Sequence, residues 1–328
     1  MYTIIQELES NNSRLFKEDI IKREAHEENI NFFEGCQLAL NPLTTFGVKQ
    51  VPERSGPEGS GLSWNEFCDL AEQLMKRELT GHAARDAINE AMEQSDDYEW
   101  NSWYRRILIK DLRCGVSEKT INNVVKKVNK DYTIPVFKCM LAHDSANHEK
   151  KLVGKKLLDY KLDGVRVLTI YDAKADSVTM YSRNGKQFIN FGHIEEEILN
   201  TIASKFSESM VLDGEMVSSS FQALMKQVHR KDNVQAKDAQ YALFDVLTLK
   251  EFKSGESKKG CWDRHLQLQD LLKDAKEDSN MFVVDKVECN FSTDEGQKVF
   301  KDYNKMALDK GFEGIMIKDG DAVYECKR

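Results

Sequence analysis

A lysine, a carboxylate, a glycine and an arginine lie within six residues near the middle of the chain, in the run K-L-D-G-V-R at 161–166. Lysine attacks as a nucleophile only when it is deprotonated, so a site that uses Lys161 must lower its pKa with nearby cations or with burial. Gly164 lets the backbone turn and a ligand approach closely, and Arg166 offers a planar fork suited to phosphate. The pattern indicates covalent group transfer onto Lys161, although a lysine beside an Asp-Gly turn is also ordinary hairpin chemistry.

Four further motifs follow this run along the chain. They are S-R-N-G at 182–185, L-D-G-E at 212–215, Y-A-L-F-D-V at 241–246 and E-G-I-M-I-K at 313–318. Their succession resembles the nucleotidyltransferase motifs of ATP-dependent DNA ligases, in particular the phage (T-even-like) type. The resemblance implies three steps: a lysine takes AMP from ATP, AMP passes to the 5′-phosphate of a nick in double-stranded DNA, and the 3′-hydroxyl displaces AMP.

The resemblance also implies a role for the polar residues of the first motifs. Lys161 is the nucleophile, Asp159 contacts the adenine edge, and Asp163 orients Lys161 or the 3′-hydroxyl unless it is a structural turn residue. Arg166 is expected to reach the ribose or a phosphate. Arg183 is expected to meet the phosphate of the nick, its alternative being a hairpin arginine in solvent.

The later motifs supply an aromatic ring, two carboxylates and a second lysine. Phe244 is expected to stack on adenine, although its strand alone would assign it to the core. Glu215 is expected to hold a ribose hydroxyl or Mg²⁺, and Glu313 to be the second Mg²⁺ ligand, because oxygen ligands suit that ion. Lys318 is expected to bind the ATP phosphates, and strand alternation places it on the face opposite Glu313.

Two segments near the N-terminus resemble the DNA-binding domain that precedes the catalytic core in phage, archaeal and eukaryotic ligases. They read E-L-T-G-H-A-A at 78–84 and K-D-L-R-C-G-V-S-E-K-T-I at 110–121. Thr80 and Gly81 are predicted to start a helix whose free N–H groups bind phosphate.

The second of these segments is predicted to contain another helix start. Gly115 is expected to end one helix and Ser117 to cap the next. Arg113 and Lys119 flank this start and would contact the same phosphate. The alternative is an ordinary helical hairpin with good caps.

The charge of the chain is unevenly distributed. The formal net charge is −8, yet residues 101–130 contain eight basic and two acidic side chains, a local excess of 8 − 2 = +6. Such a run alone is most often a solvated helix face, but together with the helix starts it favours DNA binding. The basic residues are Arg105, Arg106, Lys110, Arg113, Lys119, Lys126, Lys127 and Lys130.

The patterning predicts a multidomain chain. Apolar residues recur at helical spacing in the first 135 residues, and Ser63 with Glu66 forms a capping box. From there strand patterns dominate, so we expect an all-α DNA-binding domain at 1–135 and an α+β adenylation domain built on antiparallel sheets at 136–328. The strands are expected at 165–171, 177–182, 209–213, 240–247, 281–287 and 313–317, and the helices at 192–205, 219–230, 262–274 and 293–309.

Several expectations concern the chain as a whole. The last family motif and the OB-fold domain that normally follows are missing from the sequence, so we expect full sealing by this chain alone to be absent or very low. Seven scattered cysteines predict reduced thiols, and the sequence lacks a signal peptide or an apolar membrane span. We therefore expect a cytoplasmic monomer that uses ATP and Mg²⁺. The rival functions are an RNA ligase, a capping guanylyltransferase and a non-catalytic nick-binding protein.

Overall fold

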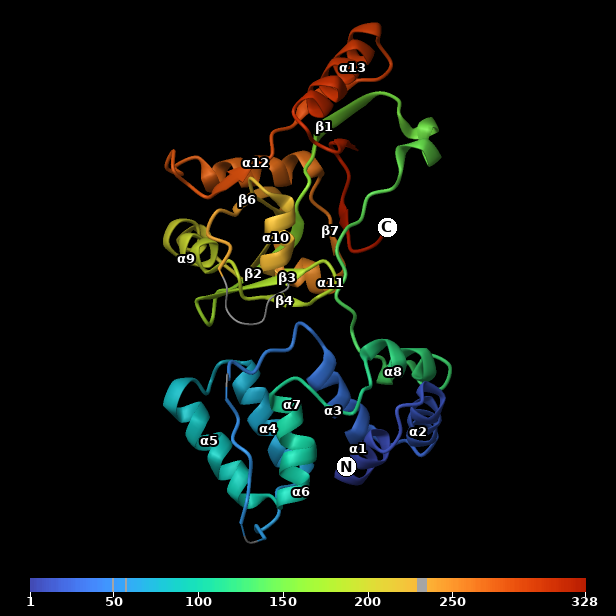
Figure 1. Cartoon of the computed structure of the whole chain (residues 1–328), viewed down its shortest axis with the longest axis vertical. Helices are drawn as coiled ribbons and strands as arrows, with labels where there is room; N and C mark the ends of the chain where they lie inside the picture. The colour runs from blue at the N-terminus through green and yellow to red at the C-terminus, as the bar shows by residue number, and fades with distance from the viewer. Residues whose placement is uncertain (49, 57, 229–234) are drawn as a thin grey trace. The chain divides into compact units, whose positions relative to one another are not determined.

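The computed structural model describes residues 1–48, 50–56, 58–228 and 235–328 (Figure 1). Contacts divide the chain into two compact units, Met1–Phe137 and Lys138–Arg328, called unit 1 and unit 2 below. In the described part of the chain, no helix combines the length and the apolar character needed to cross a membrane. All seven cysteines lie in that part and are free thiols.

Unit 1 is built from helices. The one from 64 to 75 begins at the predicted capping box, where Ser63 accepts from the Glu66 N–H and the Glu66 carboxylate accepts from the Ser63 N–H. The helices of unit 1 are α1 (Tyr2–Glu9), α2 (Arg14–His26), α3 (Ile30–Leu40), α4 (Trp64–Met75), α5 (Gly81–Gln94), α6 (Asp97–Glu99), a π-helical turn (Trp100–Tyr104), α7 (Arg105–Leu108), α8 (Glu118–Val125) and a 3₁₀ turn (Lys130–Tyr132).

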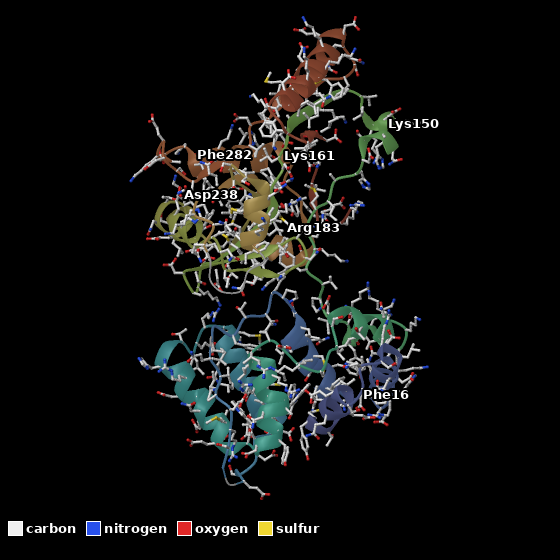
Figure 2. All side chains as sticks on the ribbon, in the orientation of Figure 1. Phe16, Lys150, Lys161, Arg183, Asp238 and Phe282 are labelled. Atoms are coloured by element: carbon white, nitrogen blue, oxygen red, sulfur yellow. The ribbon has the colours of Figure 1, made fainter. Side chains whose placement is uncertain are left out.

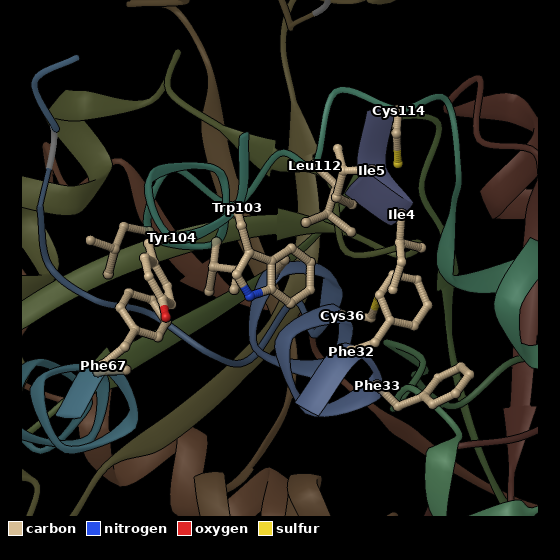
Figure 3. Close-up of a cluster of buried hydrophobic side chains, with 14 of the residues drawn as sticks. Ile4, Ile5, Phe32, Phe33, Cys36, Phe67, Trp103, Tyr104, Leu112 and Cys114 are labelled. Carbon is tan, nitrogen blue, oxygen red and sulfur yellow. The ribbon is translucent and has the colours of Figure 1, made fainter. Parts of the chain in front are cut away.

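Aromatic packing forms the core of unit 1 (Figure 3). Trp103 is fully buried and stacks on Phe32 with ring centroids 5.9 Å apart. A Cβ on Gly35 would lie 2.2 Å from the indole, so only glycine lets α3 approach Trp103 this closely. This contact joins α3 to the segment that leads into α7.

The segment between α7 and α8 differs from the sequence prediction, because Gly115 does not end a helix. Helix α7 ends at Leu108, and Gly115 lies in the irregular segment that follows, with φ +65°. A Cβ on Gly115 would meet the Lys17 ammonium at 2.6 Å, and that ammonium donates to the Cys114 carbonyl at 2.7 Å. The left-handed φ of this position, rather than this contact, favours glycine, because the ammonium at the end of the flexible Lys17 side chain could move aside. Ser117 does cap α8 as predicted.

The described residues of unit 2 form three sheets. The largest has six strands in the order β4-β3-β2-β5-β6-β8, and helices α9, α10 and α12 contribute to its apolar core. The strands are β1 (Lys155–Lys161), β2 (Val165–Asp172), β3 (Ser177–Ser182), β4 (Gln187–Phe188), β5 (Met210–Val217), β6 (Gln240–Thr248), β7 (Glu256–Ser257), β8 (Met281–Val283), β9 (Val287–Asn290), β10 (Gly314–Lys318) and β11 (Tyr324–Glu325).

A smaller sheet has the order β10-β1-β9, with α13 packed against it (Figure 1). Tyr160 on β1 stacks on Tyr303 of α13, with ring centroids 4.7 Å apart. The helices of unit 2 are α9 (Gly192–Thr201), α10 (Phe221–Val228), α11 (Leu249–Ser254), α12 (Cys261–Leu272) and α13 (Asp294–Asp309), with 3₁₀ turns at Ser145–Asn147, Glu149–Lys151 and Ala203–Lys205.

The α+β prediction for this part of the chain is confirmed, with local corrections. The single strand expected at 281–287 is two strands, because the chain leaves the large sheet after β8 and joins the small sheet as β9. The pair β6 and β8 is parallel rather than antiparallel. Helix α11 was not predicted, and residues 229–230 of the helix expected at 219–230 lie outside the described residues.

A buried ion pair ties α12 to the large sheet. The Arg264 and Asp245 side chains are 1% and 2% exposed, and the guanidinium donates to both carboxylate oxygens, at 2.5 and 3.1 Å. We expect Arg264→Met to lower the free energy of unfolding by about 3 kcal/mol, because it leaves Asp245 as a buried charge without a partner.

Urea unfolding followed by circular dichroism measures this loss. Lys273→Met is the control, since Lys273 and Asp270 form an exposed pair, and such pairs contribute little to stability. Equal shifts of the urea midpoint in the two variants would contradict the expectation.

Candidate active site

Lys161 lies where the chain passes from one sheet to the other. It is the last residue of β1, pairs with Gly314 of β10, and is followed by a short turn into β2 (Figure 2). Its ammonium forms an ion pair with Glu313, and its side chain is 49% exposed. The predicted nucleophile is thus held at a strand end, accessible to a ligand.

Gly164 brings this turn against β5. A Cβ there would lie 2.3 Å from the Met216 carbonyl oxygen and 2.8 Å from Cγ of Glu215, so no other residue fits without a shift of the backbone. Asp163 is exposed beside it. The glycine therefore places the Lys161 turn next to Glu215.

Glu215 has a strongly perturbed carboxyl group. It pairs in register with Arg166 across β2 and β5. Burial raises its pKa to about 7, a shift that Arg166 opposes and the Asp213 carboxylate reinforces. Near neutral pH this carboxyl group can therefore exchange a proton or accept a cation.

Arg166 is held by a partner that the sequence analysis did not identify. Its guanidinium donates to both oxygens of Asp213, at 2.6 and 2.7 Å, and to the Met140 carbonyl at 3.1 Å. Tyr324 donates to the same carboxylate at 2.6 Å. The expected contact of Arg166 with ribose or phosphate has to be made from this fixed position.

Phe244 lies at a bulge between β5 and β6. Pairing runs from Asp213 with Asp245 directly to Gly214 with Leu243, so Phe244 is the extra residue on its strand. The Arg166 guanidinium and the Lys318 ammonium lie over its ring, 4.7 and 5.2 Å from the centroid. The ring is only partly buried, unlike an ordinary core phenylalanine.

Asp159 is buried on β1, two residues before the nucleophile. Its Oδ2 accepts from Lys286 at 2.5 Å and from Lys318 at 2.8 Å, while Oδ1 has no hydrogen-bond partner among the described residues. Burial alone would raise the pKa of this carboxyl group, but the two ammonium groups hold it below its usual value. Asp159 therefore presents one free acceptor oxygen.

Glu313 does not follow the predicted strand alternation. Strand β10 begins at Gly314, whose φ is +146°, and Glu313 precedes it with its N–H donating to the Lys161 carbonyl at 3.2 Å. Its carboxylate therefore reaches the Lys161 ammonium rather than sharing the apolar face of Ile315, which packs in the core with α13.

Arg183 lies in the hairpin turn between β3 and β4 (Figure 2). Gly185 adopts φ +80° in this turn, and its N–H donates to the Ser182 carbonyl at 2.9 Å. The Arg183 side chain is exposed, as both the nick-contact role and the solvent alternative require.

Of the two helix starts predicted to bind phosphate in unit 1, the start of α8 at Ser117 has a side-chain cap and the start of α5 has none. Ser117 accepts from the Thr120 N–H at 3.3 Å, and both Arg113 and Lys119 are exposed. At the other start, the Thr80 side chain makes no capping hydrogen bond and Gly81 has φ +55°.

Part of the basic excess at 101–130 is used inside unit 1. Arg105 donates to the Val51 carbonyl, and Arg106 to the Leu112 carbonyl. Lys110 donates to the carbonyls of Leu38 and Asn41, and burial lowers its pKa to about 7. The exposed basic side chains are Arg113, Lys119, Lys126, Lys127 and Lys130.

Three residues of the site were missed by the sequence analysis: Asp213, Lys286 and Tyr324. Asp213 carried a signal, because it is a charge inside an apolar run, and such a charge needs a partner when buried. Nothing in the sequence near Lys286 or Tyr324 indicated a role in the site. Each binds a carboxylate, Asp159 or Asp213, that lies more than 100 positions away along the chain.

The sequence profile of a family described as "ATP dependent DNA ligase domain" matches residues 139–328. A solved structure named Pmar-Lig_Pre is 50% identical, with a TM-score of 0.62, and the match covers 100% of this chain and 75% of that one. The DNA ligase of Enterobacteria phage T4 is 24% identical over 81% of this chain and 61% of its own length. The DNA ligase of Natronomonas pharaonis is 29% identical over 52% of this chain and 30% of its own length. The chain thus spans less than two thirds of the phage protein.

The raised pKa of Glu215 predicts a pH-dependent stability. The pKa of a glutamate in the unfolded chain is about 4.3, whereas that of Glu215 in the folded protein is about 7. Between these pH values the folded state binds more protons than the unfolded state. The folded state therefore loses stability as the pH rises through this range. We expect Glu215→Gln to remove this loss. Between pH 5 and 8 the free energy of unfolding of the wild type should fall by on the order of 2 kcal/mol relative to that of the variant.

Thermal unfolding of both proteins in EDTA at the two pH values measures the difference. Glu288→Gln is the control, because Glu288 is exposed and paired only with Lys155 among the ion pairs of the described residues. A wild type and Glu215→Gln variant with parallel pH profiles would contradict the assignment.

Proposed function

Because this chain belongs to the ATP-dependent DNA ligase family, we propose that it takes AMP from ATP onto Lys161, as the first step of joining nicks in double-stranded DNA. The observation that carries the proposal is the position of Lys161. Its ammonium is paired with Glu313 at a strand end, next to the Gly164 turn and Glu215. The T4 relative is named a DNA ligase, which supports the same reaction.

The first step forms a bond between Lys161 Nζ and the α-phosphorus of ATP and breaks the bond to pyrophosphate. Lys161 is paired with Glu313, and an amine attacks only without its proton, so the lysine must leave this carboxylate before it attacks. Lys318 and Arg166 supply positive charge beside Phe244, on which the adenine ring stacks. Asp159 Oδ1 is free to accept from the adenine amino group.

Two carboxylates suit a divalent cation. Glu313 pairs with Lys161, and the Lys161 charge acts on Glu215, so both lie at the nucleophile. Oxygen ligands of this kind match Mg²⁺, which would supply charge neutralisation at the phosphates. Ionisation of Glu215 and release of Glu313 from Lys161 make both carboxylates available.

In the later steps AMP passes from Lys161 to the 5′-phosphate of the nick, and the 3′-hydroxyl then attacks that phosphate and releases AMP. We assign the exposed Arg183 to the nick phosphate and the exposed Asp163 to the orientation of the hydroxyl. We propose that unit 1 binds the DNA backbone through the α8 start at Ser117, with Arg113 and Lys119, and through Thr80 and Gly81 at the α5 start. The protein would act as a monomer in the cytoplasm.

Intact-mass spectrometry after incubation with ATP and Mg²⁺ tests the first step. We expect one AMP adduct on the wild type and none on Lys161→Ala, because no other amine replaces the nucleophile. Lys155→Ala, at the exposed start of the same strand, is the matched control and should keep the adduct.

The same assay separates the rival functions. Addition of a nicked duplex should discharge the adduct, and GTP should not replace ATP. A GTP-derived adduct would favour a capping guanylyltransferase, and discharge by nicked RNA alone would favour an RNA ligase. If wild-type protein that carries no AMP at the start forms no adduct, the lysyl-AMP proposal is wrong and a non-catalytic nick-binding protein becomes the better explanation.

DNA binding by unit 1 has its own test. We expect Arg113→Ala/Lys119→Ala to weaken binding to a nicked duplex by about tenfold and to reduce the slope of log affinity against log salt by about two, since two phosphate contacts are lost. Fluorescence anisotropy at several salt concentrations measures both. Arg14→Ala, an exposed residue paired with Glu18 on α2, should change neither. An unchanged salt slope in the double variant would argue against this surface.

A further inference from the structure

Asp159 has two cationic partners where one would be enough. The carboxylate is 2% exposed, and both ammonium groups donate to the same oxygen, Oδ2. A buried carboxylate needs a counter-ion, but one lysine already provides it. The second lysine leaves a net positive charge beside the site.

The two lysines differ in what they can reach. Lys286 lies in the short link between β8 and β9, and its side chain is fully buried, at 0% exposed. Lys318 ends β10, is 15% exposed, and holds its ammonium 5.2 Å from the centre of the Phe244 ring. Lys318 can therefore turn toward a nucleotide bound at Phe244, whereas Lys286 is confined to Asp159.

If Lys318 were the sole partner of Asp159, its movement toward a nucleotide would leave the carboxylate without a counter-ion. A buried carboxylate in that position takes up a proton, and its oxygen can then donate as well as accept. This matters because Oδ1 is buried and has no partner among the described residues. An ionised Oδ1 accepts from the amino group of adenine and repels the carbonyl oxygen that guanine presents at the same ring position.

We propose that Lys286 is a positioning residue that holds Asp159 in its acceptor form and thereby frees Lys318 for a phosphate of the bound nucleotide. The inference rests on the proposed function, because it takes Asp159 as the adenine contact. Lys286 touches neither the nucleotide nor the reacting atoms. It acts through Asp159 and, by replacing Lys318 there, through Lys318.

Calorimetric titration of ATP and of GTP in EDTA tests this proposal without adenylyl transfer. We expect Lys286→Met to lower ATP affinity roughly tenfold and to narrow the preference for ATP over GTP, since Lys318 then stays on Asp159 or Asp159 takes a proton. Lys286→Arg keeps a cation beside the carboxylate and should retain the ATP preference. Lys155→Met, on the same sheet but exposed, should behave as wild type.

A double-mutant cycle separates this role from a structural one. In an Asp159→Asn background there is no carboxylate to neutralise, so Lys286→Met should cause no further loss of ATP affinity. This double variant also removes both charges of the pair and thus does not leave a buried charge unpaired. An equal loss in both backgrounds, or an unchanged ATP preference in Lys286→Met, would overturn the proposal.

The binding assay and the adduct assay test the two proposals separately. A wild type that binds ATP but forms no adduct with Mg²⁺ would count against the proposed function, while the cycle in EDTA would still decide the role of Lys286. A wild type that forms the adduct, with Lys286→Met binding ATP and GTP as the wild type does, would overturn the role of Lys286 and leave the proposed function standing.

Discussion

Gly164 lies so close to β5 that a Cβ on it would be 2.3 Å from the Met216 carbonyl oxygen, and the rest of the site depends on this approach. The glycine follows β1 of the small sheet and precedes β2 of the large one. A side chain there would push the turn away from β5 and carry Lys161 away from Glu215. The junction of two sheets, rather than either sheet alone, therefore builds the site.

Three buried carboxylates support this junction, and each is bound by a cation from another element. Asp213 holds Arg166, Asp245 holds Arg264, and Asp159 holds two lysines. Removing a charge from water is costly unless a partner meets it with good geometry, so these pairs constrain where the strands and α12 can lie. Lys161, Glu313 and Glu215 are less enclosed, which leaves them free to change partner or proton.

In unit 1 some basic side chains stabilise the fold, while others are exposed on the surface. Arg105, Arg106 and Lys110 belong to the basic run, yet they donate to backbone carbonyls inside the unit. The run therefore overstates the charge available to DNA. What is left on the surface includes Arg113 and Lys119 beside a capped helix start, a smaller but better placed set.

The sequence by itself determined the features that depend on neighbouring residues. The capping box at Ser63 and the apolar periodicity of helices and strands arise within a few positions of one another, where backbone geometry sets the spacing. The motifs from Lys161 to Lys318 are likewise short runs that can be read one at a time. Only the tertiary structure decided which partner each buried charge has. Asp159 meets Lys286 across 127 positions and Asp213 meets Tyr324 across 111, because sheet register and the crossing between sheets bring them together. The same long-range packing brings the Lys17 ammonium to the Cys114 carbonyl, next to Gly115, which lies in an irregular segment instead of at a helix end.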